Sequence, residues 1–222
     1  MLINVKELFK DYYLDRITVP VLKDVSFSVE KGEYVAIMGP SGSGKSTLMN
    51  ILGLLDTQTK GTYEFDGEDT LLLNEKQLAH LRNRKIGFVF QRFHLLNTET
   101  ALNNVILPLN YSSVPPKQRK ALAIDALEKV GLGDRLNFKP MQLSGGQCQR
   151  VAIARAMVTK PQVIFADEPT GSLDTESGNQ ILEIFRELNS EGTAIVMITH
   201  EREVAEHADR ILYMKDGVLS AE

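Results

Sequence analysis

The chain has 222 residues, of which 43% are hydrophobic, and carries a formal net charge of -4 at pH 7 with a sequence pI near 5.7. This length suits one large domain, and the hydrophobic content suffices for a packed core. The acidic balance argues against a protein that binds nucleic acid by neutralising phosphates, so we expect no nucleic-acid partner. The single cysteine excludes an internal disulfide, and because no apolar run approaches ~20 residues we expect no membrane span.

The apolar pattern along the chain predicts two kinds of strand. Runs with strand-like alternation, bounded by Gly, Asp or Lys, occur at 3–8, 21–30 and 61–67. They predict an antiparallel layer at the start of the fold. Continuous apolar runs, typical of strands buried on both faces of a parallel sheet, occur at 34–38, 86–90, 163–167 and 193–199. Helical patterns separate most of these runs, so we expect an α/β fold with a mostly parallel sheet and an N-terminal antiparallel β-subdomain.

A glycine-rich loop follows the apolar run at 34–38. Residues 39–46 (GPSGSGKS) fit the pattern G-x-x-x-x-G-K-[ST] between a strand and a helix, which is the context in which this pattern binds nucleotide phosphates. Gly42 and Gly44 leave room for the backbone to wrap the phosphates of ATP. We expect Lys45 to reach the β- and γ-phosphates and the Ser46 hydroxyl to ligate Mg²⁺. The predicted nucleotide-binding residues of this loop are Gly39, Ser41, Gly42, Ser43, Gly44, Lys45, Ser46 and Thr47.

The pattern changes to helix between residues 100 and 160. This stretch is the best candidate for a helical subdomain inserted into the α/β core, and we place it at approximately residues 92–160 of a single domain that covers residues 1–222. Its clearest helix covers residues 117–132, with Gly131 as the expected stop. The side chains expected on one apolar face of this helix are Leu122, Ala126, Leu127 and Val130.

A second glycine loop, LSGGQ at 143–147, leads directly into a helical pattern. The positive end of that helix would face the loop, which makes it a second anion site, but no second lysine loop accompanies it. A single chain would therefore hold two incomplete halves. If two copies pack head to tail, Ser144, Gly145 and Gly146 of one copy close on the γ-phosphate held by the other, and ATP joins the dimer.

The apolar run at 163–167 ends in two adjacent carboxylates, Asp167 and Glu168. Ligands of open α/β sheets bind at the carboxyl ends of the strands. We expect Asp167 to join the Mg²⁺ shell through water, and Glu168 to orient the water that attacks the γ-phosphate or to accept its proton. Gln91 and His200 end two other apolar runs in the same way, which predicts Gln91 at Mg²⁺ or the water and His200 at the γ-phosphate. The predicted catalytic residues are Glu168 and His200, and the predicted metal ligands are Ser46, Gln91 and Asp167.

Six motifs in this order resemble those of the ATP-binding cassette (ABC) ATPases, over nearly the whole chain. They are the Walker A loop (39–47), the Q-loop (Gln91), the signature (143–147), Walker B with its glutamate (163–168), the D-loop (172–174) and the switch His200. The resemblance implies that Tyr12 stacks on adenine, with Tyr13 as a close competitor. It also implies contacts to the partner's nucleotide from Ser144, Gly145, Gly146, Gln147 and Asp174. Cys148 departs from the glutamine that the most similar subgroup usually carries there.

Residues 86–109 and 166–174 look most like the subgroup that powers lipoprotein release, macrolide or peptide export, and the division-linked cassette. The resemblance implies an ATP-hydrolysing motor, dimeric in its ATP state, that drives integral membrane permease subunits from the cytoplasmic side of the inner membrane. Its substrate would be an antimicrobial peptide, macrolide or lipoprotein. The alternative is a cassette that signals through a membrane partner to a cell-wall enzyme. Cassettes that act on DNA or ribosomes usually carry heptad insertions or two cassettes, and neither occurs here.

The segment after Gln91 places apolar side chains close to a residue expected to sense nucleotide. Phe93, Leu95 and Leu96 occur there in the sequence RFHLLNTETALNNV. We expect this segment to dock a helix of the membrane partner, with burial in its own helical subdomain as the alternative.

Overall fold

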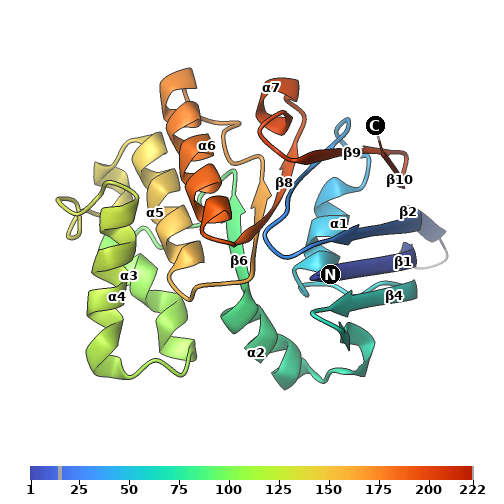
Figure 1. The fold of residues 1–222 in the computed structure, drawn as a ribbon, viewed down its shortest axis with the longest axis horizontal. Helices are drawn as coiled ribbons and strands as arrows, with labels where there is room; N and C mark the ends of the chain where they lie inside the picture. The colour runs from blue at the N-terminus through green and yellow to red at the C-terminus, as the bar shows by residue number, and fades with distance from the viewer. Residues whose placement is uncertain (15–16, 222) are drawn as a thin grey trace.

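The computed structural model describes residues 1–14 and 17–221, and the strands within them form two sheets (Figure 1). The first is antiparallel in the order β2-β1-β4-β5. Its strands are β1 (Ile3–Leu14), β2 (Ile17–Val29), β4 (Lys60–Phe65) and β5 (Glu68–Asp69). Ile3 pairs with Val29 on one side and Phe65 on the other, and all three side chains are buried because strand alternation turns them to one face. The predicted antiparallel layer is confirmed.

The second sheet has the order β10-β9-β3-β8-β7-β6, with only β10 antiparallel to its neighbour among the described strands. Its strands are β3 (Tyr34–Met38), β6 (Ile86–Phe90), β7 (Val163–Asp167), β8 (Ala194–Thr199), β9 (Arg210–Lys215) and β10 (Val218–Ala221). Phe90 is in register with Asp167, which is in register with Ile198. The loops after β6, β7 and β8 therefore leave the sheet at one edge.

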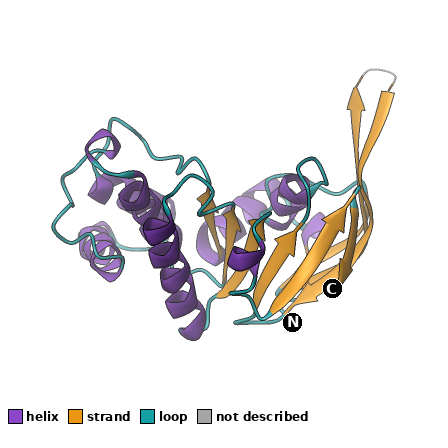
Figure 2. Cartoon of the chain, turned by 90° about the horizontal axis from the view of Figure 1, so that it is seen from above, coloured by secondary structure: helices purple, strands orange, loops and turns teal. Residues whose placement is uncertain are grey.

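The two faces of this sheet are buried in two different hydrophobic clusters. Phe165 and Val196 pack with the antiparallel sheet and helix α1 (Lys45–Leu52), whereas Ile164 and Ile195 pack with the helices of the other face. Those helices include α5 (Gly145–Met157) and α6 (Thr175–Ser190), on the opposite side of the molecule from β1, β2 and β4 (Figures 1 and 2). Burial on both faces explains why these strands are continuously apolar.

The predicted helical stretch lies between β6 and β7. It contains α3 (Ala101–Ile106), η2 (Leu107–Tyr111), α4 (Pro116–Lys129) and η3 (Pro140–Gln142) ahead of α5. Helix α4 buries Ala123, Ala126 and Leu127, leaves Leu122 half-buried, and is followed by Gly131 at φ 70. Other helices outside this stretch are η1 (Thr70–Leu72), α2 (Glu75–Lys85) and α7 (Arg202–Ala205). Among the described residues, no helix has the length and apolar character needed to cross a bilayer.

Candidate active site

A cleft of about 640 Å³ opens at the sheet edge where β3, β6, β7 and β8 end. It brings together residues from five separate parts of the chain, including most of those predicted from the sequence. The predicted residues that line it are Ser41, Gly42, Gly44, Lys45, Ser46, Thr47, Gln91, Asp167, Glu168 and His200. Val21 of β2 and Pro40 complete the lining, and neither was predicted. The register of the parallel strands accounts for this convergence.

The glycine loop is held in a conformation that only glycine tolerates at two positions. Gly44, at φ 107, caps α1, and Gly39 lies so close to the β9 backbone that a Cβ would stand 2.0 Å from the Met214 oxygen. Lys45 Nζ donates to the carbonyl oxygens of Gly39 (2.7 Å) and Pro40 (2.8 Å), which folds the side chain back over the loop. Ser43 is buried beneath the loop. Gly39 and Ser43 therefore shape the loop rather than line the cleft.

The charges of the cleft favour a cation beside the phosphate loop. Burial, then the neighbouring Glu168, raise the pKa of Asp167, while burial lowers the pKa of Lys45. The shift of Asp167 shows that its negative charge is costly without a nearby cation, whereas the shift of Lys45 shows that its positive charge is costly without an anion such as a phosphate. Ser46, Gln91 and Asp167 offer hydroxyl, amide and carboxylate oxygens, which are ligands that Mg²⁺ accepts. The residues present therefore fit a divalent cation.

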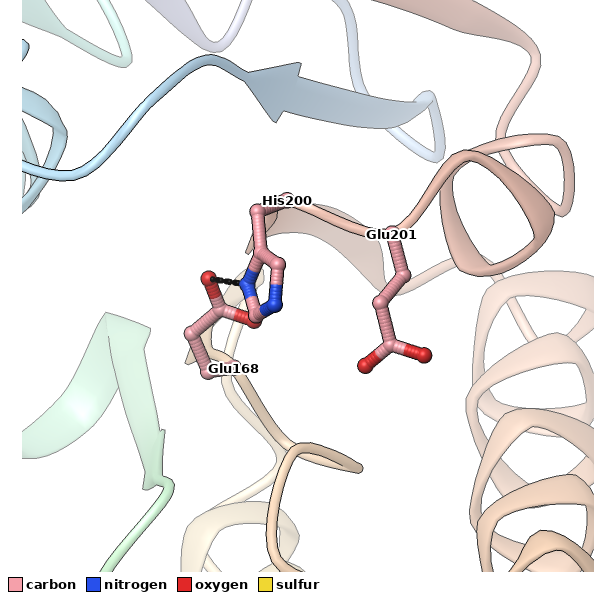
Figure 3. A group of neighbouring side chains, drawn as sticks. All are labelled: Glu168, His200 and Glu201. Carbon is pink, nitrogen blue, oxygen red and sulfur yellow. Dashed lines mark hydrogen bonds and ion pairs between the residues drawn. The ribbon is translucent and has the colours of Figure 1, made fainter.

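Glu168 and His200 form a pair at the ends of β7 and β8 (Figure 3). His200 Nδ1 donates to Glu168 Oε1 over 2.7 Å, and this hydrogen bond raises the pKa of His200. Because a carboxylate only accepts, Nδ1 carries the proton and leaves Nε2 for another partner. Glu168 Oε2 is buried without a hydrogen-bond partner in the described part of the chain, and Glu168 has a left-handed backbone at φ 45. An unpartnered buried oxygen and a strained backbone are features that cluster at functional sites, and Glu168 has both.

Glu201 is a neighbour that the sequence analysis missed. Its carboxylate, the Glu168 carboxylate and the His200 ring have ligand atoms within 4.8 Å of one another, although Figure 3 draws a contact only between Glu168 and His200. Glu201 is exposed and follows His200 directly in the sequence. That adjacency was the available signal, since an acid next to a strand-end histidine shares its edge of the sheet.

The Gln91 segment contacts the loop that follows β7. Ser172 Oγ donates to the Gln91 carbonyl oxygen over 3.3 Å, and a Cβ at Gly171 would stand 3.0 Å from Gln91 Nε2. The amide of Gln91 therefore lies against the turn that carries Glu168. This packing places the Q-loop and the Walker B loop in one unit at the cleft.

The LSGGQ residues lie at the N-terminus of α5 and contribute nothing to the lining of the cleft in the described chain. Ser144 and Gln147 form a reciprocal capping box, with Gln147 N–H donating to Ser144 Oγ (3.2 Å) and Ser144 N–H donating to Gln147 Oε1 (3.0 Å). Gly146 packs against Ser177 of α6, and the Ser177 hydroxyl donates to Asp174 over 2.8 Å. Ser144, Gly145 and Asp174 are all exposed.

Tyr12 lies on β1 outside the lining of the cleft, 38% exposed. Its hydroxyl donates to Asp56 Oδ2 over 2.8 Å, and the Thr47 side chain also contacts it. Burial, followed by the Asp56 hydrogen bond, raises the pKa of Tyr12. Tyr13 is 67% exposed and pairs across the hairpin with Thr18. Thr47 thus ties Tyr12, and not Tyr13, to the phosphate loop.

The apolar residues after Gln91 were expected either to dock a helix of the membrane partner or to be buried in the helical subdomain, and they differ in how far they are buried. Leu95 packs against the helical hydrophobic cluster, Phe93 is half-buried, and Leu96 is 46% exposed.

Cys148, the departure noted in the signature helix, is buried and its Sγ donates to the Pro140 carbonyl oxygen over 3.5 Å. Its side chain fills space under η3.

A phosphate-binding loop, an acidic strand end and a separate glycine-capped helix on this α/β scaffold define a cassette-type nucleotide-binding ATPase. The family model described as "ABC transporter" matches residues 22–171. The chain belongs to the ABC transporter family, whose ATP-hydrolysing cassette it forms. The predicted α/β fold is likewise confirmed by solved cassettes.

Two relatives and one pair of structures show what the chain is similar to. It is 55% identical to the uncharacterized ABC transporter ATP-binding protein YvrO of Bacillus subtilis, covering 98% of this chain and 95% of the relative. It is 50% identical to the macrolide export ATP-binding/permease protein MacB of Aggregatibacter actinomycetemcomitans, covering 100% of this chain but 34% of MacB. Two dimeric structures of the cassette MJ0796 superpose with a TM-score of 0.90, cover 99% of this chain and 98% or 97% of theirs, and are 41% and 43% identical; the first contains ADP and Pi.

Proposed function

We propose that the chain is the ATP-driven motor of a membrane export or extraction machine, and that two copies enclose ATP head to tail. One observation carries the proposal. The cleft contains the phosphate loop and the acidic strand ends, whereas the capped N-terminus of α5, with its exposed Ser144 and Gly145, lies outside it. Each copy therefore offers half of a phosphate site on two separate surfaces.

The chemistry proposed for one half-site follows from the contacts. Lys45 releases the Gly39 and Pro40 carbonyls and neutralises phosphate oxygens, and the backbone N–H groups at the start of α1 donate to them. Mg²⁺, held by Ser46, Gln91 and Asp167, supplies charge neutralisation at the phosphates when bound.

Glu168 is the proposed base of the reaction. It holds the attacking water and takes its proton on the carboxylate, at the cleft that Glu168 lines. His200 keeps Oε1 in place through Nδ1 and turns Nε2 toward the γ-phosphate. The proton of the attacking water therefore passes to the Glu168 carboxylate, whose orientation is already fixed by the hydrogen bond from His200.

The second copy supplies the remaining donors of the proposed site. Ser144, Gly145, Gly146 and Gln147 bring the positive end of α5 to the γ-phosphate, and Asp174 lies at the same surface. Binding of ATP then joins the copies and hydrolysis separates them, which is the movement that does work on a partner.

The proposed partner is an integral membrane permease. An apolar groove of about 350 Å³ runs along edge strand β6, and its lining includes Phe88, Phe90, Pro108 and Tyr111. Tyr111 is 76% exposed, so a helix of the permease can bury it. We place the chain at the cytoplasmic face of the inner membrane as a peripheral subunit. The relative MacB, named as a macrolide export protein, supports export, and we propose a peptide, macrolide or lipoprotein as the substrate.

The deciding experiment is the molar mass of Glu168→Gln by size-exclusion chromatography with light scattering, with and without ATP and Mg²⁺. The amide keeps the shape of the side chain but cannot take a proton, so ATP persists. We expect a monomer without nucleotide and a dimer with ATP. Adding Ser144→Arg should return the ATP sample to monomer, because the new side chain fills the contact surface.

A matched control separates this contact from added charge alone. Ser190→Arg places the same side chain at the exposed far end of α6, about 24 Å along the helix from its start. The Glu168→Gln, Ser190→Arg protein should still dimerise with ATP. If Glu168→Gln binds ATP but remains a monomer both with and without ATP and Mg²⁺, the head-to-tail site is contradicted.

A further inference from the structure

The backbone two and three residues after Gln91 adopts a conformation that its side chains disfavour. Phe93 has φ 50 and His94 has φ 48, two consecutive non-glycine residues in the left-handed region. Such a conformation costs ~1–2 kcal/mol for each residue. It persists only where neighbouring groups hold it.

One side chain holds both of these residues. Arg155 of α5 donates through Nη2 to the Phe93 carbonyl oxygen (2.9 Å) and through Nη1 to the His94 carbonyl oxygen (2.6 Å). Consecutive carbonyls of an extended chain point in opposite directions, but the left-handed turn brings these two within reach of one guanidinium. The His94 ring then packs on Phe90, with ring centroids 4.7 Å apart.

Among the described residues, the Arg155 guanidinium donates its hydrogen bonds to these two carbonyl oxygens. It is half-buried, and within residues 1–14 and 17–221 it pairs with no carboxylate. A desolvated cation without an acid partner is costly unless dipoles compensate it. The two carbonyl oxygens supply that compensation, so the guanidinium and the left-handed turn stabilise each other.

The consequence concerns Gln91, which lines the cleft, while the turn that follows it is bonded to the signature helix. We infer that Arg155 is a positioning residue: by holding the Phe93–His94 turn it fixes Gln91 relative to the LSGGQ end of the same helix. The inference rests on the proposed function. It assigns Arg155 to the productive geometry of ATP hydrolysis and not to the binding of ATP.

The test compares steady-state ATP turnover of the full chain with that of Arg155→Lys. A lysine ammonium cannot donate to both carbonyls in the fork geometry of arginine. We expect kcat to fall about tenfold while KM for ATP changes by less than about twofold. Arg155→Gln, which removes the charge and keeps an amide donor, is the second variant and should behave in the same way. Unchanged kcat in both, or a change in KM alone, overturns the inference.

A rescue experiment isolates the backbone. Glycine adopts positive φ freely, so His94→Gly should restore kcat of Arg155→Lys to within about threefold of the original chain. His94→Ala is the matched control, because it removes the same ring without freeing φ. Equal rescue by glycine and alanine, or rescue by neither, contradicts the positioning role.

Hydrogen exchange gives a readout that does not depend on turnover. Amides 93–97 should exchange about tenfold faster in Arg155→Lys, while amides of β7 and β8 keep their protection. If the unsubstituted chain does not hydrolyse ATP, the proposed function fails, but the exchange experiment still decides whether Arg155 holds the turn. Unchanged exchange at 93–97 overturns the inference on its own.

Discussion

The contact between the signature helix and α6 permits a prediction worked from two adjacent glycines. A Cβ built on Gly146 stands 2.7 Å from Ser177 Oγ and 2.9 Å from Ser177 Cβ, closer than side chains tolerate. A Cβ on Gly145 meets Leu173 Cδ2 at 3.4 Å, which is ordinary contact. Neither glycine has a positive φ, so alanine suits both backbones. Gly146→Ala should therefore lower the free energy of unfolding, whereas Gly145→Ala should not.

The magnitudes follow from two opposing effects. Alanine in a helix gains up to ~1 kcal/mol over glycine, and overpacking costs ~1–3 kcal/mol. Gly146→Ala should lower the free energy of unfolding by about 1–2 kcal/mol, whereas Gly145→Ala should leave it unchanged or raise it by up to ~1 kcal/mol. At this chain length the loss corresponds to a fall in Tm of about 3–6 °C.

The assay is urea unfolding of the nucleotide-free chain, so that no phosphate contact contributes. Ser177→Gly removes both clashing atoms and should recover Gly146→Ala with a coupling free energy of at least ~1 kcal/mol. Ser177→Ala keeps the Cβ and should recover it only in part. Equal stabilities of the Gly145→Ala and Gly146→Ala proteins would refute the packing argument.

Two further predictions concern charge and nucleotide contact. Asp66 accepts from Lys31 and Lys85, both at 2.8 Å, and from Gln162 at 3.3 Å, and these bonds hold its pKa well below its usual range. Asp66→Asn keeps a residue that tolerates φ 51 and should cost about 1–2 kcal/mol at pH 7. Because the folded-state pKa is depressed, the carboxylate stabilises the fold above the unfolded pKa, and about 1 kcal/mol of the difference should vanish between pH 6 and pH 3; parallel stability curves of the two proteins would contradict this. Tyr12→Ala should weaken nucleotide binding about tenfold in a fluorescence titration, whereas Tyr13→Ala should change it less than about twofold, and the reverse order would make Tyr13 the stacking residue.

The sheet strands were predictable because burial on both faces leaves an uninterrupted apolar run. Three of the four predicted core strands coincide with β3, β6 and β7, and the fourth lacks only its first predicted residue. The N-terminal hairpin was underestimated. Strand β1 continues to Leu14 through register shifts that break its alternation, so the pattern reveals only residues 3–8. Strands β9 and β10 were missed, since half-buried positions dilute their apolar signal.

The cleft residues were predictable from their positions at strand ends, but their mutual contacts were not. The bond between His200 and Glu168 depends on the register of β7 and β8, which no local pattern contains. Likewise, the contact of Gly146 with Ser177 joins residues that the sequence presents as separate caps. The left-handed turn at Phe93 and His94 carries no glycine, so it left no signal at all.

The position of Arg155 gives helix α5 a role at both of its ends. Its first turn carries the residues proposed to meet the partner's nucleotide, and Arg155, in its last turn, holds the turn that follows Gln91 of the same chain. A helix of 13 residues spans about 20 Å, so α5 links two surfaces of the molecule over that distance. Gln91 contacts the loop that carries Glu168, and the turn that follows Gln91 is bonded through Arg155 to α5, so these contacts form a continuous path from Glu168 to the helix. In the proposed dimer the same helix meets the partner's γ-phosphate, so this path offers a physical connection between the two half-sites through Arg155.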